Sequence, residues 1–193
     1  MIIGSHNSWS YLTPKKWWMK LIKFTAKCQD VDIRTQYEKY NVKCFDLRIN
    51  FLNKFETVQV VHNHIVYDID ISKLSDNLRY LNCKNDVKVR VLLDIRNKNK
   101  LTDKQIIYFR GFCKSLENNF KAITFFGGTD LCKGSLIYDF KNNITIDDKY
   151  ASVAEPKIID DWYPRIYALF NNKKNIAKGT DKDVLLIDFV NIN

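Results

Sequence analysis

Short runs of apolar and β-branched residues recur along the whole chain and predict β-strands. The clearest are KCFDLRI at residues 43–49, KVRVLLDI at 88–95 and DVLLIDFV at 183–190. Weaker runs complete a set of eight predicted strands, at residues 1–5, 57–61, 122–126, 135–140 and 150–154.

More polar stretches between these runs have the spacing of helices. We predict helices at residues 15–28, 32–40, 71–82, 102–119 and 160–171. In the third, Leu74, Leu78 and Leu81 recur at helical spacing. In the fourth, Thr102 is placed to cap the helix amino terminus, with Gln105 three residues later.

Strands that alternate with helices predict an α/β fold, and eight of them predict a (β/α)8 TIM-type barrel. The chain has 193 residues, whereas such barrels typically need about 250. We therefore expect a compact, irregular barrel in which some connections lack a helix. With three prolines and six glycines, no linker divides the chain, so residues 1–193 are predicted to form one domain. A doubly wound open sheet is the structural alternative.

Polar side chains stand where the predicted strands end. Active sites of barrel enzymes lie at the carboxyl ends of the strands. The residues at those ends are His6, Arg48, His62, Arg96, Lys141 and Asp188. Because the first and last strands of a closed barrel are neighbours, we expect Asp188 to lie beside His6.

These residue types suit the cleavage of a phosphodiester. The reaction needs a base for the nucleophile, an acid for the leaving oxygen and positive charge for the phosphoryl oxygens. His6 and His62 can divide the acid and base work, and the planar guanidinium of Arg48 matches phosphate. Asp188 can orient His6 and stabilise its protonated form.

Net charge and cysteine content restrict the classes of partner and the kinds of metal or disulfide site that the chain can have. The net charge of +9 favours anionic partners, which include nucleic acid, lipid headgroups and phosphorylated substrates. Five cysteines without CxxC spacing argue against a disulfide framework and against a zinc site, and we expect buried free thiols. No signal peptide is visible and no apolar run approaches about 18 residues, so we expect a soluble, non-secreted or cytoplasmic protein.

Four segments resemble the phosphatidylinositol-specific phospholipase C family, in its bacterial, metal-independent form. GSHNSWSYL (4–12) is similar to the opening of the X region and TQYEKYNVKCFDLRI (35–49) to the second strand with its preceding helix. VQVVHNH (58–64) is similar to the strand that carries the second catalytic histidine, and LLIDFVN (185–191) to the terminal strand. Their order and approximate spacing agree over nearly the whole chain.

The resemblance implies a role for each matched residue. His6 is then the base that deprotonates the inositol 2-hydroxyl, with Asp188 as its partner, and His62 is the acid that protonates the diacylglycerol oxygen. Arg48 stabilises the transition state and is held by Asp46. The implied products are diacylglycerol and a cyclic inositol phosphate. Headgroup contacts are implied for Arg96, Lys141, Asp161 and Tyr163.

Two positions qualify the resemblance. Calcium-dependent relatives carry a carboxylate ligand where Arg48 stands, and a fixed guanidinium there would repel the ion, so we expect no metal and no cofactor. Bacterial members have Asp after the first histidine, whereas this chain has Asn7. An amide can orient His62 but cannot raise its pKa as a carboxylate would, so we expect a weaker acid step or one shifted to lower pH.

Residues 14–27 (PKKWWMKLIKFTAK) combine Trp17 and Trp18 with lysines, which is typical of a helix at a membrane interface. An ordinary barrel helix with its aromatic face in the core is the alternative. For partners, the resemblance implies an anionic phospholipid substrate and peripheral membrane contact, with no nucleic acid, and we expect a monomer.

Two other functions compete with this interpretation. A metal-dependent glycerophosphodiester phosphodiesterase shares the barrel and the histidine pair, but it requires clustered carboxylates where Arg48 stands. A basic lipid-binding or nucleic-acid-binding barrel without catalysis would not need two histidines and an oriented aspartate.

Overall fold

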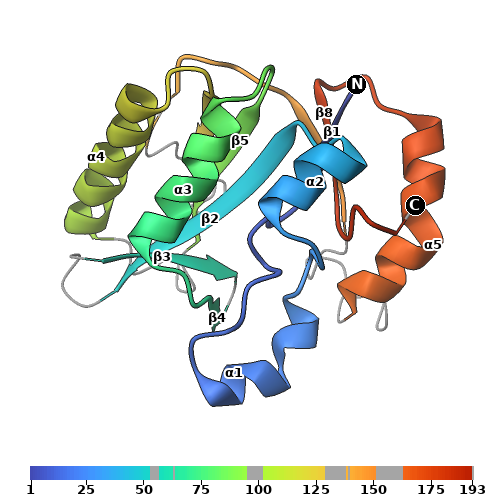
Figure 1. Cartoon of the computed structure of the whole chain (residues 1–193), viewed down its shortest axis with the longest axis horizontal. Helices are drawn as coiled ribbons and strands as arrows, with labels where there is room; N and C mark the ends of the chain where they lie inside the picture. The colour runs from blue at the N-terminus through green and yellow to red at the C-terminus, as the bar shows by residue number, and fades with distance from the viewer. Residues whose placement is uncertain are drawn as a thin grey trace.

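Six strands run parallel in one curled sheet, in the order β7–β8–β1–β2–β5–β6 (Figure 1). The computed structural model describes residues 1–52, 57–62, 64–94, 102–128, 138, 140–150 and 163–192. Its strands are β1 (Ile2–Ser5), β2 (Cys44–Leu52), β3 (Thr57–His62), β4 (Ile65–Val66), β5 (Lys88–Leu93), β6 (Thr124–Gly128), β7 (Ile146–Lys149) and β8 (Val184–Ile187). Its helices are α1 (Trp17–Leu21), the 3-10 helix η1 (Lys23–Thr25), α2 (Ile33–Tyr40), α3 (Ile71–Asn82), α4 (Asp103–Asn119) and α5 (Pro164–Lys178).

The strand order distinguishes a barrel-type sheet from a doubly wound one. The last strand, β8, pairs with the first, β1, and the order then continues through β2 and β5 to β6 without reversing. A doubly wound sheet reverses its order at a switch point. The sheet is therefore an irregular barrel-type sheet, as the sequence predicts.

The helices form where their predicted signals stand. Helix α3 has the predicted bounds and begins at Asp70, whose side chain accepts a hydrogen bond from Lys73 N–H. Helix α4 begins after Thr102, which forms a reciprocal capping box with Gln105. Helices α3 and α4 line a common groove, α2 contacts α3, and α5 contacts β8 (Figure 1). Helix α1 stands apart from this layer, at the bottom of the view.

Several predicted bounds were wrong. The helix predicted at 15–28 is divided into α1 and η1, because the backbone leaves helical geometry at Ile22. Strand β7 was not predicted, because its two aspartates hide the strand pattern. Most of the seventh strand predicted at 150–154 lies outside the described residues. Helix α5 begins at Pro164, a residue suited to the first helical turn, and runs to Lys178. Most of the strand predicted at 135–140 lies outside the described residues.

The third predicted strand differs most from expectation. β3 pairs antiparallel with β2, and Ile49 of β2 is opposite both Val60 of β3 and Leu93 of β5. β5 occupies one edge of β2, so β3 lies along the other edge, which it shares with β1. β1 and β3 therefore approach each other end to end along one edge of β2. This arrangement brings the carboxyl ends of both strands together.

Most of the described cysteines are buried, as predicted. Cys28, Cys44 and Cys113 are buried free thiols, whereas Cys83, at the carboxyl-terminal end of α3, is exposed. Cys132 lies outside the described residues. Among the described helices, none combines the length and apolar character needed to cross a bilayer.

Candidate active site

His6 and Asp188 follow two neighbouring parallel strands. Ser5 of β1 is opposite Ile187 of β8, so the next residue of each strand emerges at the same end of the sheet. His6 Nδ1 lies 2.7 Å from Asp188 Oδ1, and both side chains are buried. The neighbourhood predicted from barrel closure is therefore present.

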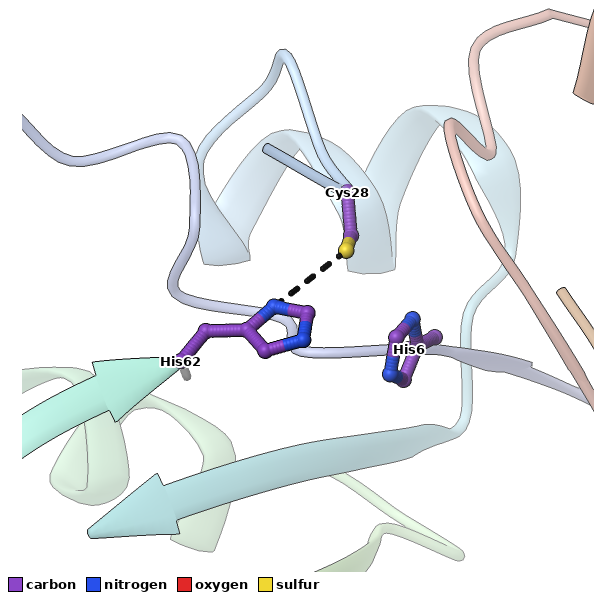
Figure 2. Close-up of side chains that lie close together, drawn as sticks. All are labelled: His6, Cys28 and His62. Carbon is purple, nitrogen blue, oxygen red and sulfur yellow. Dashed lines mark hydrogen bonds between the residues drawn. The ribbon is translucent and has the colours of Figure 1, made fainter. Parts of the chain in front are cut away.

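His62 is the last residue of β3 and faces His6 across the junction of β1 and β3. The two imidazole rings are 5.3 Å apart between centroids and nearly perpendicular, at 84°. His62 Nδ1 lies 3.1 Å from the carbonyl oxygen of Ala26, to which it donates in its neutral Nδ1–H form. Cys28 Sγ lies 3.6 Å from the same nitrogen (Figure 2).

Asn7 is buried beside the pair but does not hold His62 in the way expected. The described hydrogen-bond partners of the His62 ring are Ala26 and Cys28. Asn7 has a left-handed backbone, with φ of 42°, and its backbone N–H donates to Asp46 Oδ2 at 3.0 Å. The carbonyl of Ala26 thus orients the ring of His62, and Asn7 contributes through its backbone.

Two arginines and a carboxylate lie on the same face of β2 and β5. Arg48 Nε donates to Asp46 Oδ2 at 2.9 Å, as the resemblance implies. Arg90 is opposite Asp46 in the register and lies between two carboxylates: its Nε is 4.0 Å from Asp46 Oδ1, and its Nη1 is 3.3 Å from Asp148 Oδ1. All of these side chains except Asp148 are buried. Arg90 was not predicted as a site residue, although it shares with Arg48 a place between two aliphatic residues of a predicted strand.

Tyr150 is a second site residue that was not predicted from the sequence. It follows β7, the strand next to β8, and its ring stacks on the His6 imidazole with centroids 3.6 Å apart and planes 3° from parallel. Together with Asp188, this contact fixes the orientation of the His6 ring.

Burial and positive charge determine the protonation of the two histidines. Burial lowers the pKa of His6 well below its ordinary value, and the Arg48 charge lowers it further. Burial and then Arg48 lower the pKa of His62 to about 3, against the opposing effects of Asp46 and the Ala26 carbonyl. Although burial alone would raise the pKa of Asp46, Arg48 and Arg90 hold it below its ordinary value. At neutral pH the site therefore has two neutral imidazoles beside two guanidinium groups.

The comparisons with known proteins add a structural likeness. No family model and no curated protein sequence matches the chain. Among solved structures, the phosphatidylinositol-specific phospholipase C from Listeria monocytogenes is similar with a TM-score of 0.64 and 16% identity, over 97% of this chain and 87% of the other. The Staphylococcus aureus enzyme is similar with a TM-score of 0.61 and 19% identity, over 97% and 85%.

The chain has the fold of these phospholipases C. Its sheet is the irregular form of the barrel that both neighbours contain, and the predicted fold class is confirmed.

Within the described part of the chain, the residues implied to bind the headgroup are not brought together with the histidine pair. Arg96 and Asp161 lie outside the described residues. Lys141 is exposed, and Tyr163 caps α5 and stacks on Phe24 with centroids 5.4 Å apart. Among the described contacts, none joins Lys141 or Tyr163 to the histidine pair. Their role in headgroup binding stays a prediction.

The low pKa of His62 predicts a loss of stability in acid. The unfolded chain takes up this proton near pH 6.5, whereas the folded protein does so only near about pH 3. Between these values the unfolded state binds more protons, so the free energy of unfolding falls as the pH is lowered. Replacing His62 by Asn, whose amide can still donate to Ala26, should make urea-denaturation midpoints less sensitive to pH in this window. The exposed His64→Asn variant should keep nearly all of the wild-type dependence, because the His64 charge is only a minor cause of the low pKa of His62. Equal slopes for all three proteins would contradict the assignment.

Proposed function

We propose that the protein is a phosphatidylinositol-specific phospholipase C. It cleaves the phosphodiester by attack of the inositol 2-hydroxyl, giving diacylglycerol and a cyclic inositol phosphate. The observation that carries the proposal is one constellation: His6 bonded to Asp188, His62 facing it, and Arg48 fixed by Asp46 beside both. The shared fold supports it.

His6 is the general base in this proposal. Asp188 accepts a hydrogen bond from Nδ1–H, which leaves Nε2 as the basic nitrogen. Among the described residues, Nε2 is buried and has no hydrogen-bond partner. It takes the proton from the 2-hydroxyl as the oxygen attacks phosphorus, and Asp188 stabilises the imidazolium that forms.

Arg48 binds the phosphoryl oxygens. Its bond to Asp46 runs through Nε, which leaves the terminal amino groups of the guanidinium for the phosphate. Arg90, between Asp46 and Asp148, adds a second positive charge to the same face of the sheet. Both charges are in place before the substrate arrives, so no reorganisation is needed as negative charge develops.

His62 is the general acid. Its Nδ1–H bond to Ala26 leaves Nε2 to carry the proton that is transferred. Because an adjacent anion favours the protonated form of an imidazole, the bound phosphodiester raises the pKa of His62 from its low value in the free protein. His62 then protonates the diacylglycerol oxygen as its bond to phosphorus breaks. In this proposal the charge of the substrate raises the pKa of His62. In bacterial relatives an aspartate at the position of Asn7 would have that effect.

Calcium has no part in the proposed reaction, because the guanidinium groups of Arg48 and Arg90 supply the positive charge that a metal would. The test is the turnover of phosphatidylinositol vesicles by purified protein in excess EDTA and in added calcium. We expect equal rates within about twofold. Activity that EDTA removes and that glycerophosphodiesters support would favour the metal-dependent alternative, and vesicle binding without turnover would favour a silent lipid-binding barrel.

The segment around α1 supports peripheral attachment to a bilayer. Its side chains are largely exposed, at 74% for Trp17, 41% for Trp18, 68% for Leu21 and 50% for Phe24, whereas Met19 is buried. The alternative of an ordinary barrel helix with its aromatic face in the core therefore does not hold for these four residues. We propose that they enter the membrane interface while neighbouring lysines contact anionic headgroups.

Replacing Trp17 and Trp18 together by Ala should weaken partitioning onto phosphatidylinositol-containing vesicles by about ten- to a hundred-fold, because two large apolar surfaces no longer leave water. A vesicle sedimentation assay measures this change. The matched control is Ile107→Ala, which removes an exposed apolar side chain from α4 and should leave partitioning unchanged. Equal partitioning of the double variant and the wild type would remove the proposed membrane contact.

We propose further that the enzyme acts as a monomer on anionic phospholipid and has no nucleic-acid partner. A cytoplasmic or otherwise non-secreted location stays a prediction.

A further inference from the structure

Three buried side chains from separate segments converge on one point of the active site. His6 follows β1, Cys28 follows η1 and His62 ends β3, and Figure 2 shows them facing a common space. One potential ligand atom from each lies within 4.8 Å of the other two. All three side chains are buried, so the cluster is held by the fold.

The spacing already matches part of a zinc coordination sphere. In a tetrahedral site with Zn–N of about 2.1 Å and Zn–S of about 2.3 Å, the nitrogen and sulfur are about 3.6 Å apart. Cys28 Sγ and His62 Nδ1 are separated by 3.6 Å. The ligand atom of His6 lies within 4.8 Å of both. The His6 ring is held by Asp188 and Tyr150, so movement of the other two side chains toward it closes the remaining distance.

His6 has the second feature of a metal ligand. Its Nε2 is buried, and among the described residues it has no hydrogen-bond partner. Its other nitrogen is bonded to Asp188. A carboxylate that holds one nitrogen of an imidazole while the other faces a metal is the usual outer arrangement of zinc centres.

We propose that His6, Cys28 and His62 form a zinc site that inhibits the enzyme. One thiolate and two imidazoles suit zinc and leave a fourth position for water, whereas calcium and magnesium prefer oxygen ligands. On binding, the Cys28 thiol loses its proton to solvent. The His62 proton moves from Nδ1 to Nε2 by exchange with solvent, which ends the bond to Ala26 and leaves the Nδ1 lone pair facing the ion. The Ala26 carbonyl keeps its hydrogen bond from Tyr67.

Inhibition follows because zinc binds the nitrogen that acts as the general base. This expectation of inhibition rests on the proposed function. His6 Nε2 cannot bind zinc and accept the proton of the 2-hydroxyl at the same time. The absence of CxxC spacing argued against a zinc site, but such spacing reveals only ligands that are close in sequence. The three ligands proposed here come from segments that are far apart in the sequence. Cys28 is thus the residue that turns a catalytic pair into a metal site.

Cobalt substitution tests the site without any assay of turnover. Titration of the purified full chain with Co²⁺ should give one equivalent bound, with the near-ultraviolet absorption of a thiolate–cobalt bond that zinc displaces. Cys28→Ser should lose this absorption, and Cys83→Ser, which removes an exposed thiol, should keep it. Asp188→Asn should weaken zinc binding by about 10- to 100-fold in competition with a chromogenic chelator.

Three results would overturn the proposal: no thiolate–cobalt absorption in the wild type, absorption that survives Cys28→Ser, or absorption that Cys83→Ser removes. If circular dichroism shows that Cys28→Ser is unfolded, the test is the His62→Asn variant, which keeps all cysteines. The proposal requires that this variant has a weaker thiolate–cobalt absorption than the wild type.

A second arm measures inhibition and separates this proposal from the proposed function. Zinc should inhibit wild-type turnover, EDTA should restore it, and Cys28→Ser should need at least about tenfold more zinc for half inhibition. If the wild type shows the thiolate–cobalt absorption but no turnover, the proposed phospholipase activity is refuted and the proposed zinc site is still supported. Turnover without metal binding would refute the site alone.

Discussion

The His6→Asn variant is expected to turn over phosphatidylinositol about 10²- to 10⁴-fold more slowly than the wild type. The Asn amide can occupy the place of Nδ1 and keep the hydrogen bond to Asp188, so the buried carboxylate retains a donor. What disappears is Nε2, the nitrogen that accepts the proton of the attacking hydroxyl. The loss should appear in kcat measured on vesicles at saturating lipid, in the presence of EDTA.

Two controls separate a catalytic effect from a folding defect. The variant should remain folded, with a urea-denaturation midpoint lowered only by the loss of the Tyr150 stack, and should keep its vesicle binding, because the surface around α1 is unchanged. The exposed His64→Asn variant should keep full turnover. A His6→Asn rate within about tenfold of the wild type would mean that another group is the base.

Arg48→Lys should lower kcat by about 10²- to 10³-fold, although the positive charge is kept. The guanidinium bonds Asp46 through Nε and has further donors for the phosphoryl oxygens, whereas one ammonium group cannot fill both places. The ammonium should stay with Asp46, because Arg48 makes the shortest ion pair to this buried carboxylate, and Arg90 at 4.0 Å replaces it only in part. The transition state then loses its fixed donors.

The comparison that isolates this effect is Arg79→Lys, a change of the same kind in an exposed ion pair on α3. It should leave kcat unchanged. Vesicle binding of Arg48→Lys should also be unchanged, because the loss is in the chemical step. A kcat within about threefold of the wild type would exclude Arg48 as the group that stabilises the transition state.

Periodic and capping signals predicted much of the fold. The bounds of α3 follow from three leucines at helical spacing, and the start of α4 follows from Thr102 and Gln105. The pairing of Asp188 with His6 follows from barrel closure, because it needs only the positions at which two strands end. These features are local, or depend on a single topological rule.

The antiparallel orientation of β3 could also have been predicted. Parallel strands need a crossover connection of about a dozen residues or more, and the segment between β2 and β3 is far shorter. The predicted parallel orientation of β3 was wrong, but the predicted place of His62 beside the carboxyl end of β1 was right. This is because β3 runs toward that end of β1.

Other parts of the site leave no pattern in the sequence. The Ala26 carbonyl and the Cys28 thiol reach His62 from the irregular segment after η1, where no periodicity indicates direction. Tyr150 follows a strand that contains two aspartates, so its position beside His6 depends on a strand that the hydrophobic pattern does not mark.

Phosphorus NMR of phosphatidylinositol vesicles incubated with the purified protein in excess EDTA tests the central claim most directly. The account predicts that the phosphodiester signal is replaced by that of a five-membered cyclic inositol phosphate, and that His6→Asn forms this product only at a strongly reduced rate. A signal of a phosphomonoester with no cyclic species before it, or no change in the phosphodiester signal, would contradict the account.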